Sequence, residues 1–339
     1  MDLLQDLCLT NTNSRRILMK ILGISCGRRM SNSEILVKEA LMGAEEIGAE
    51  VELIRLNDLQ IKPCTGCNAC VVSLLEKCGS GDCVIKNDDY GFIEEKIMEC
   101  DGLIVSSAIY EKSPSGLLKT LNDRMGPSHD IAFRMIAKKQ REERGITTGK
   151  GPDERSFKQR VASLIAVGGS EWDTLALPML HLFTLPMQIN VVDKILVNWV
   201  GLPGSVVFKE NELNRARQSG RHVAETLMNP NTEAKYIGES GLCPICHSKL
   251  VEIRNHDDNY PAICGICGVK GTLEVEQGKV KFNVTEEDRA HSHVLISGKF
   301  EHADELYKVS LKPNSKAGEL PERLKKYKNY LSYSRPARN

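Results

Sequence analysis

Apolar segments of two kinds alternate along residues 15–232. Short runs rich in branched side chains predict strands, whereas longer stretches whose apolar positions recur at helical spacing predict helices. The expected strands cover residues 15–25, 49–56, 102–108, 161–169 and 189–198, and the expected helices cover 33–48, 89–99, 114–124, 171–187 and 210–228. This alternation is typical of a parallel sheet with helices on both faces.

Strands joined by helical crossovers predict a doubly wound α/β fold, a five-stranded parallel sheet in the flavodoxin-like order 2-1-3-4-5. In such a sheet a ligand binds beyond the carboxyl ends of the strands. One stretch, residues 126–160, exceeds what a crossover needs and is rich in Lys and Arg. It predicts either a solvated insertion helix with a mobile tip, or a lid or a docking patch for an acidic redox partner.

The two ends of the chain differ from this unit. Residues 1–14 predict a disordered preface, 238–285 a small metal-binding ribbon, and 286–339 a polar tail with one helix near 318–332. The 45 basic and 45 acidic residues balance, so the composition gives no reason to expect nucleic acid as a partner. The sequence offers neither a long apolar run nor a secretory signal, so we expect a cytoplasmic protein without a membrane partner.

Five of the twelve cysteines lie within residues 64–83, between a predicted strand and the next predicted helix. Cys64, Cys67 and Cys70 follow one another at three-residue spacing, and Cys78 and Cys83 come later. Four thiolates on a short loop are what an iron–sulfur cluster requires. Structural zinc or free thiols are the alternatives, although zinc more often uses two separated cysteine pairs.

Such a separated arrangement occurs once, near the carboxyl end of the chain. Two CxxC pairs, Cys243 with Cys246 and Cys264 with Cys267, are flanked by short hairpin-like segments. This spacing predicts a ribbon that holds one metal ion. We expect zinc, with a rubredoxin-type iron as the alternative.

The turn after the first strand reads ISCGRRMSNSE (24–34) and matches neither a dinucleotide fingerprint nor a P-loop. Its hydroxyl, amide and guanidinium groups stand where a helix begins, so they favour a single phosphate such as that of FMN; an ordinary helix cap with surface arginines is the alternative. The candidate phosphate ligands are Ser25, Arg28, Ser31, Asn32 and Ser33. Two later strand ends, with Tyr110 and with the pair Gly168 and Gly169, would lie at the same edge of the sheet.

Five segments stand out along this unit: ILGIS (21–25), IKPCTGCNAC (61–70), CVIKNDD (83–89), DGLIVSSAIY (101–110) and VGGS (167–170). In combination they resemble the NADPH-dependent FMN reductase family, in particular its iron–sulfur flavoprotein branch. The resemblance implies FMN at the three turns, a 4Fe-4S cluster near the flavin, and a homo-oligomer. It places the flavin ring against Ala108, Ile109, Tyr110, Gly168 and Gly169.

The likeness departs from the family in two places. Cys26 and Gly27 stand where the family usually has a Ser-Pro pair in a longer loop, so Cys26 is either a packing residue or an added redox thiol. The fourth cluster ligand is also open. Spacing favours Cys78, whereas the family motif favours Cys83, which directly precedes VIKNDD.

These features predict an NAD(P)H-dependent FMN oxidoreductase that passes electrons between FMN and a 4Fe-4S cluster to a small acceptor or a ferredoxin-like partner. The cofactor carries the chemistry, and we expect no side chain as acid–base catalyst. A cluster-free NAD(P)H:FMN or quinone reductase is the first alternative. A redox sensor or docking protein that uses the ribbon is the second.

Overall fold

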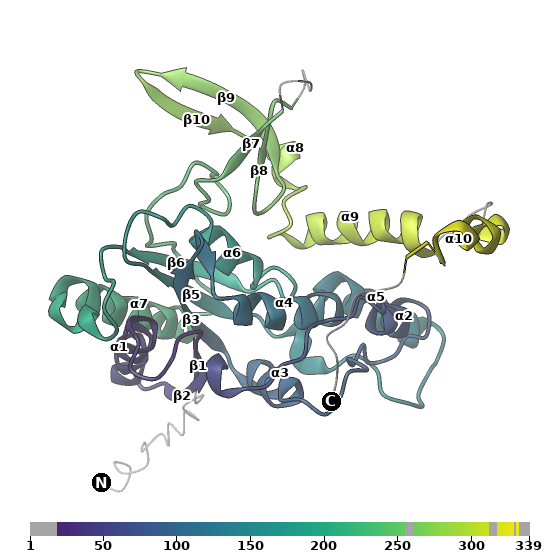
Figure 1. The fold of residues 1–339 in the computed structure, drawn as a ribbon, viewed down its shortest axis with the longest axis horizontal. Helices are drawn as coiled ribbons and strands as arrows, with labels where there is room; N and C mark the ends of the chain where they lie inside the picture. Colours follow the sequence, from purple (N-terminus) through teal and green to yellow (C-terminus); the bar gives the residue numbers. More distant parts are fainter. Residues whose placement is uncertain (1–18, 255, 257–259, 312–316, 329, 332–339) are drawn as a thin grey trace, which may run out of the picture.

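The computed structural model describes residues 19–254, 256, 260–311, 317–328, 330 and 331 (Figure 1). The preface predicted for residues 1–14 lies outside these ranges. The main sheet has the order β2-β1-β3-β5-β6, and all its neighbouring strands are parallel. Its strands are β1 (Lys20–Ser25), β2 (Glu50–Arg55), β3 (Gly102–Tyr110), β5 (Val161–Val167) and β6 (Asn190–Val197). The short β4 (Ser113–Pro114) only folds back on the end of β3, so the predicted flavodoxin-like order is confirmed.

Helices cover both faces of this sheet. One face carries α1 (Asn32–Glu46) and α7 (Glu210–Met228), and the other carries α3 (Tyr90–Glu99), α4 (Gly116–His129) and α6 (Ala176–Leu182). Because both faces are covered, the central strands are apolar throughout, and all seven residues of β5 are buried. Each fully buried Leu or Ile stabilises the fold by about 1.5–3 kcal/mol.

Helices α1 and α7 approach each other through glycine. A Cβ added at Gly43 would lie 2.0 Å from the carbonyl oxygen of Arg217, and one at Gly220 would lie 1.7 Å from that of Ala40. The missing side chains therefore let the two backbones touch. This contact fixes α1, whose first turn forms part of the candidate site.

The helix expected at 171–187 is shorter in the structure, where α6 spans Ala176–Leu182. The residues before it form a loop at the carboxyl edge of the sheet, held by a hydrogen bond of 3.1 Å from Leu175 N to the Lys112 carbonyl. Tight turns follow it, such as Thr184 N to the His181 carbonyl at 2.9 Å. Apolar residues continued beyond α6 at Phe183, Leu185 and Met187 and concealed the end of the helix.

The basic segment 126–160, predicted as an insertion, is buried at its start, over residues 128–134, and exposed over residues 147–150. It contains the end of α4, then α5 (Ile131–Glu143) and the short 3₁₀ helix η2 (Glu154–Phe157). Asp130 caps α5 by accepting hydrogen bonds from Ala132 N and Phe133 N. Helix α5 packs against α2 (Ala69–Leu75), a helix within the cysteine loop that the sequence pattern did not predict.

Residues after 240 form a second, antiparallel sheet in the order β10-β9-β8-β7. Its strands are β7 (Val251–Ile253), β8 (Ala262–Cys264), β9 (Lys270–Glu276) and β10 (Lys279–Asn283). The tail beyond was expected to contain one helix, but it contains α8 (Glu286–Arg289), α9 (Ile296–Leu306) and α10 (Leu320–Lys328).

Helix α9 buries few apolar residues: Ala303 joins a small cluster with Ala132 and Phe133 of α5, and the buried Lys299 pairs with Asp130, the residue that caps α5. Among the described residues, the helices all lack the combination of length and hydropathy that crossing a bilayer requires.

Candidate functional site

The strand ends named in the sequence analysis meet at one edge of the main sheet. Ser25 is in register with Ser106 across β1 and β3, and Cys26 N donates to the Ser106 carbonyl at 2.9 Å. A Cβ added at Gly168 would lie 3.1 Å from Cδ1 of Ile109 at the end of β3. The structure therefore brings the candidate turns together, as the predicted topology requires.

The turn after β1 is shaped by two serine hydroxyls. Ser31 caps α1 by accepting from Glu34 N at 3.3 Å, and its Oγ lies 3.1 Å from Oγ of Ser33. A Cβ added at Gly27 would lie only 2.3 Å from either hydroxyl, so the turn closes tightly over the start of the helix. Backbone N–H groups at such a start favour an anion, so these residues fit the phosphate of FMN.

The side chains of Glu34 and Asn32 stabilise this turn through hydrogen bonds to neighbouring backbone groups. Glu34 is buried and accepts from Met30 N at 3.0 Å; burial raises its pKa, but Lys38 and Arg55 outweigh burial and keep the carboxylate charged. The Asn32 side chain donates to the carbonyls of Val200 at 3.2 Å and Leu202 at 2.9 Å.

The Asn32 Oδ1 accepts from Val206 N at 3.1 Å. Its side chain is thereby committed to the loop after β6, which leaves its backbone N–H as the group for a phosphate. Arg28 is exposed beside the turn.

The end of β3 offers the candidate contacts for a flavin ring. Ala108 and Ile109 are half-buried, and Tyr110 is 62% exposed. The Ser106 hydroxyl is buried at this edge without a hydrogen-bond partner among the described residues. A buried hydroxyl without a partner is costly, and a polar ligand such as FMN would supply one.

The Cys26 thiol is buried in the core beneath the carboxyl edge of the sheet and is not exposed at the candidate site. Its side chain is buried, and burial raises its pKa to about 12 although Ser107 lowers it. A thiol with such a pKa stays protonated at neutral pH and is a poor nucleophile. Of the two roles proposed for Cys26, the structure favours packing.

Both tryptophans of the chain lie at this edge, and the sequence analysis did not single them out. Trp172 follows β5 and is 55% exposed, whereas Trp199 follows β6 and is 64% exposed with φ of 61°. Their loops are joined, because the Asn198 side chain donates to the carboxylate of Asp173. Tryptophan is mostly buried in proteins, so its presence directly after two predicted strand ends was the available signal.

In the cysteine loop, Cys64 and Cys67 are exposed and Cys70 and Cys83 are half-buried. Burial raises the pKa of Cys70, and the charges of Cys83 and Cys64 raise it further. Backbone hydrogen bonds, chiefly from Ala69 N–H, lower the pKa of Cys67.

The Cys78 side chain contacts helix α5. It is fully buried, its Sγ lies 3.4 Å from Oε1 of Gln140, and Arg144 Nη1 lies 3.6 Å from the same sulfur. Arg141 also donates to the Cys78 carbonyl at 2.9 Å. Gln140, Arg141 and Arg144, in helix α5 and at its C-cap, therefore enclose Cys78.

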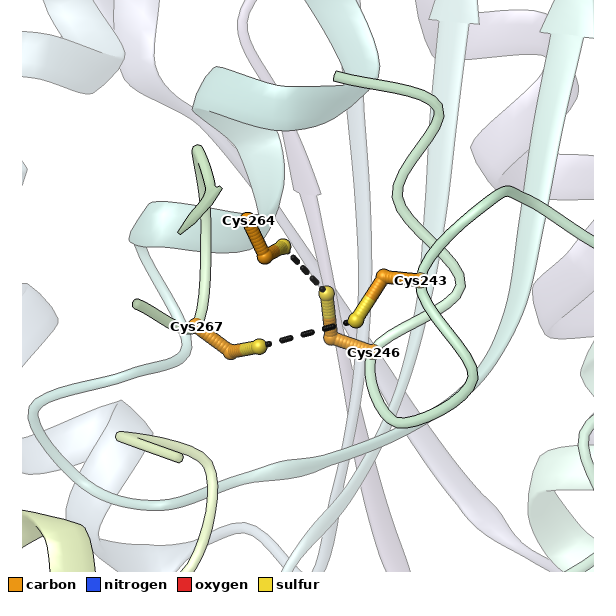
Figure 2. A group of neighbouring side chains, drawn as sticks. All are labelled: Cys243, Cys246, Cys264 and Cys267. Atoms are coloured by element: carbon orange, nitrogen blue, oxygen red, sulfur yellow. Dashed lines mark hydrogen bonds between the residues drawn. The ribbon is translucent and has the colours of Figure 1, made fainter. Parts of the chain in front are cut away.

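The second cysteine group is compact (Figure 2). Cys243, Cys246, Cys264 and Cys267 are all buried, and their sulfur atoms lie within 4.8 Å of one another. The sulfurs of Cys243 and Cys267 are 3.7 Å apart, and those of Cys246 and Cys264 are 3.4 Å apart. A Zn–S bond of about 2.3 Å in a tetrahedral site sets sulfur separations of about 3.8 Å, so the four residues fit one metal ion.

Comparisons with known proteins agree with this geometry. The model of the NADPH-dependent FMN reductase family matches residues 19–200. A flavone synthase of Aspergillus candidus is 30% identical over 299 residues, which cover 85% of this chain and 88% of that protein. An iron–sulfur flavoprotein of Methanocaldococcus jannaschii is 31% identical over 219 residues, which cover 62% of this chain and 97% of that protein.

A solved structure described as a flavone reductase is 32% identical to this chain. The match has a TM-score of 0.77 and covers 94% of this chain and all of that one. The likeness therefore extends beyond the parallel sheet and through the ribbon.

Proposed function

Because this chain belongs to the NADPH-dependent FMN reductase family and is an FMN-dependent oxidoreductase, we propose that it uses NAD(P)H to reduce a planar aromatic substrate of the flavone type. FMN, when bound, supplies hydride transfer. The chain's own residues would hold the phosphate at the turn after β1 and the ring at the ends of β3 and β5.

One observation carries the choice of substrate. Trp172 and Trp199 stand exposed on joined loops at the carboxyl edge, where the candidate ring contact Tyr110 is exposed as well. Flat aromatic surfaces of this kind suit a flat aromatic ligand. Two relatives that match most of the chain are named for flavones, whereas the iron–sulfur flavoprotein of M. jannaschii covers 62% of it.

The reaction balances as a two-electron reduction. The C2=C3 bond of a flavone is conjugated to the C4 carbonyl, so C2 accepts hydride and C3 accepts a proton. The products are the 2,3-dihydro compound and NAD(P)⁺, and the consumed reagents are NAD(P)H and one proton.

The test is an anaerobic assay of the purified protein with its bound flavin quantified. We expect oxidation of NADPH or NADH that depends on flavone and yields its dihydro product, identified by mass. Flavanone, which lacks the C2=C3 bond, is the matched control. Oxidation with a quinone or free FMN, but never with flavone, would instead support a simple FMN or quinone reductase.

We propose in addition that the cysteine loop holds a 4Fe-4S cluster through Cys64, Cys67, Cys70 and Cys83. These four cysteines are exposed or half-buried on one loop, whereas the buried contact of Cys78 with Gln140 of helix α5 argues against Cys78. Such a cluster would relay single electrons to or from a ferredoxin-like partner.

Iron and acid-labile sulfide in anaerobically purified protein test this proposal. We expect both in the wild type, and in Cys67→Ala we expect their loss with retained flavin. Cys78→Ala is the matched control and should keep its iron. Wild-type protein with flavin but no iron in the loop would leave the loop purely structural.

The ribbon's metal we propose to be zinc, since its four thiols are buried on short hairpins. From the resemblance, we also propose a homo-oligomer that works in the cytoplasm. Metal analysis and light scattering of the purified protein would test the first two of these.

A further inference from the structure

Arg124, in helix α4, is buried beside the cysteine loop with 2% of its surface exposed. Its Nη1 donates to the Lys62 carbonyl at 2.9 Å and to Oδ2 of Asp88 at 2.6 Å. Its Nη2 donates to the Ile85 carbonyl at 3.1 Å. The guanidinium is thus held by three groups that belong to the cysteine loop's flanks.

These partners close the loop. Lys62 lies two residues before Cys64, and Ile85 lies two residues after Cys83, so one side chain joins the loop's two ends. The planar fork of arginine can donate in both directions at once, which a lysine ammonium cannot do with the same geometry. The Tyr90 ring lies 4.2 Å from the guanidinium carbon and fixes its plane.

The third guanidinium nitrogen of Arg124, Nε, makes none of these hydrogen bonds. Its Nε is buried and has no hydrogen-bond partner in the described part of the chain. Burial lowers the pKa of Arg124, but Asp88 and the neighbouring Cys83 sulfur raise it above its ordinary value. Cys83 lies two residues before Ile85, whose carbonyl accepts from the guanidinium at 3.1 Å, so a Cys83 thiolate turned toward Nε would satisfy a donor that otherwise costs about 1–3 kcal/mol.

We propose that Arg124 donates its Nε–H to the Cys83 sulfur and thereby raises the reduction potential of the iron–sulfur cluster, a role that rests on the cluster proposed above. Reduction adds one electron, with no bond made or broken, to a cluster that four thiolates already make negative. An N–H···S hydrogen bond and a fixed positive charge favour the more negative state. Arg124 is thus a positioning residue for Cys83 and a determinant of the cluster's potential.

The experiment is a dithionite titration of anaerobic protein, followed by electron paramagnetic resonance, with the bound flavin as an internal reference. We expect Arg124→Lys and Arg124→Gln to shift the cluster's reduction equilibrium at least tenfold toward the oxidised form, which is 59 mV for a one-electron couple. The flavin's potential should stay unchanged.

Two further variants separate this role from mere loop closure. Arg160 is also buried, and it donates to backbone carbonyls such as those of Met98 and Arg155 away from the loop. Arg160→Lys should therefore leave the cluster's potential within twofold. Asp88→Asn removes the carboxylate that offsets Arg124, so it should shift the equilibrium toward the reduced form.

The outcomes are distinct. Wild-type protein without iron would overturn the cluster and this role together. A wild type with a cluster whose potential is the same in Arg124→Lys and Asp88→Asn would overturn this role alone. If Arg124→Gln fails to fold, Arg124→Lys and Asp88→Asn, with their opposite expected shifts, still decide the matter.

Discussion

Lys194 of the parallel sheet donates its ammonium to the carbonyl of Cys246 in the ribbon, at 2.7 Å. Lys194 lies on the edge strand β6 and is 9% exposed. Burial lowers its pKa, and the four ribbon cysteines partly offset this. Four thiolates around a divalent ion carry a net negative charge, so the flavodoxin-like unit supplies a compensating cation to a metal site built by another sheet.

We expect Lys194→Met to weaken metal retention in the ribbon. Groups that contact metal ligands from outside typically change metal affinity by about 10–100-fold when they are replaced. Competition with a coloured chelator measures the affinity. Lys249→Met, which removes an exposed ribbon lysine paired with Glu239, is the matched control and should bind metal as the wild type does. Equal affinities in the two variants would contradict the role of Lys194.

Removal of the ribbon metal should unfold the ribbon and spare the parallel sheet. The ribbon core consists of the four cysteines and a few apolar neighbours such as Ile266, Val269 and Phe282. A core of this size cannot offset chain entropy without the metal. Hydrogen exchange after chelation should show fast amides in β8 and β9 and unchanged protection in β1 and β3. Continued protection of β8 would show that the ribbon folds without its metal.

The sequence predicted the parallel sheet well because each of its strands is buried on both faces. Nearly uninterrupted apolar runs such as VASLIAV leave few alternatives, and α7 begins and ends where its periodicity predicts. The comparisons confirmed the family that the motifs suggested. The predictions failed where few apolar residues are buried, as for α9, which contacts α5 through Ala303 and the buried pair of Lys299 and Asp130.

The candidate site was predicted in outline but not in detail. Spacing could group cysteines along the chain, yet it could not reveal that Cys78 points toward Gln140 in a segment 62 residues later. The Asn32 side chain looked like a phosphate ligand, but it bonds to the carbonyls of Val200 and Leu202 in the loop after β6. Both facts depend on tertiary contacts that leave no local pattern.

Trp199 adopts φ of 61°, a left-handed conformation that costs a residue with a side chain about 1–2 kcal/mol and glycine almost nothing. We therefore expect Trp199→Gly to keep or raise the melting temperature while the KM for a flavone rises about tenfold, or about 1.4 kcal/mol of binding. Leu202→Ala, at another exposed site on the same loop, is the control.

Binding can be followed without turnover, because the chain's two tryptophans are its only indole fluorophores. Flavone should quench the emission of the wild type, and quenching should weaken in Trp199→Gly. Unchanged KM and quenching in this variant would remove Trp199 from the substrate site.

Thiol labelling should separate Cys26 from Cys67 in metal-free protein. Burial raises the pKa of Cys26 to about 12, so its thiol remains protonated and unreactive up to about pH 10. Cys67 is exposed, and backbone hydrogen bonds lower its pKa, so its thiolate forms first as the pH rises. Iodoacetamide at pH 8, read by peptide mass, should label Cys67 rapidly and Cys26 only after unfolding. Labelling of Cys26 in the folded protein would contradict the packing role and support a redox role for its thiol.

Gly27→Ala should abolish tight FMN binding while the fold survives. The new methyl group would lie 2.3 Å from the hydroxyls of Ser31 and Ser33, so the turn must open just where the phosphate is expected. We expect FMN affinity to fall at least about a hundredfold, or about 2.7 kcal/mol. Gly91→Ala is the matched control, because its Cβ would meet nothing within 4 Å and it lies in helix α3.

Fluorescence titration of FMN into flavin-free protein measures the affinity, and circular dichroism verifies the fold. The Ser31 hydroxyl that crowds Gly27 also caps α1, so opening the turn should lower the melting temperature slightly in Gly27→Ala. Gly91→Ala should raise it, since alanine is the better helix former. If Gly27→Ala binds FMN as tightly as Gly91→Ala does, the phosphate must bind elsewhere on the carboxyl edge, and the assignment of Ser31 and Ser33 to it would be wrong.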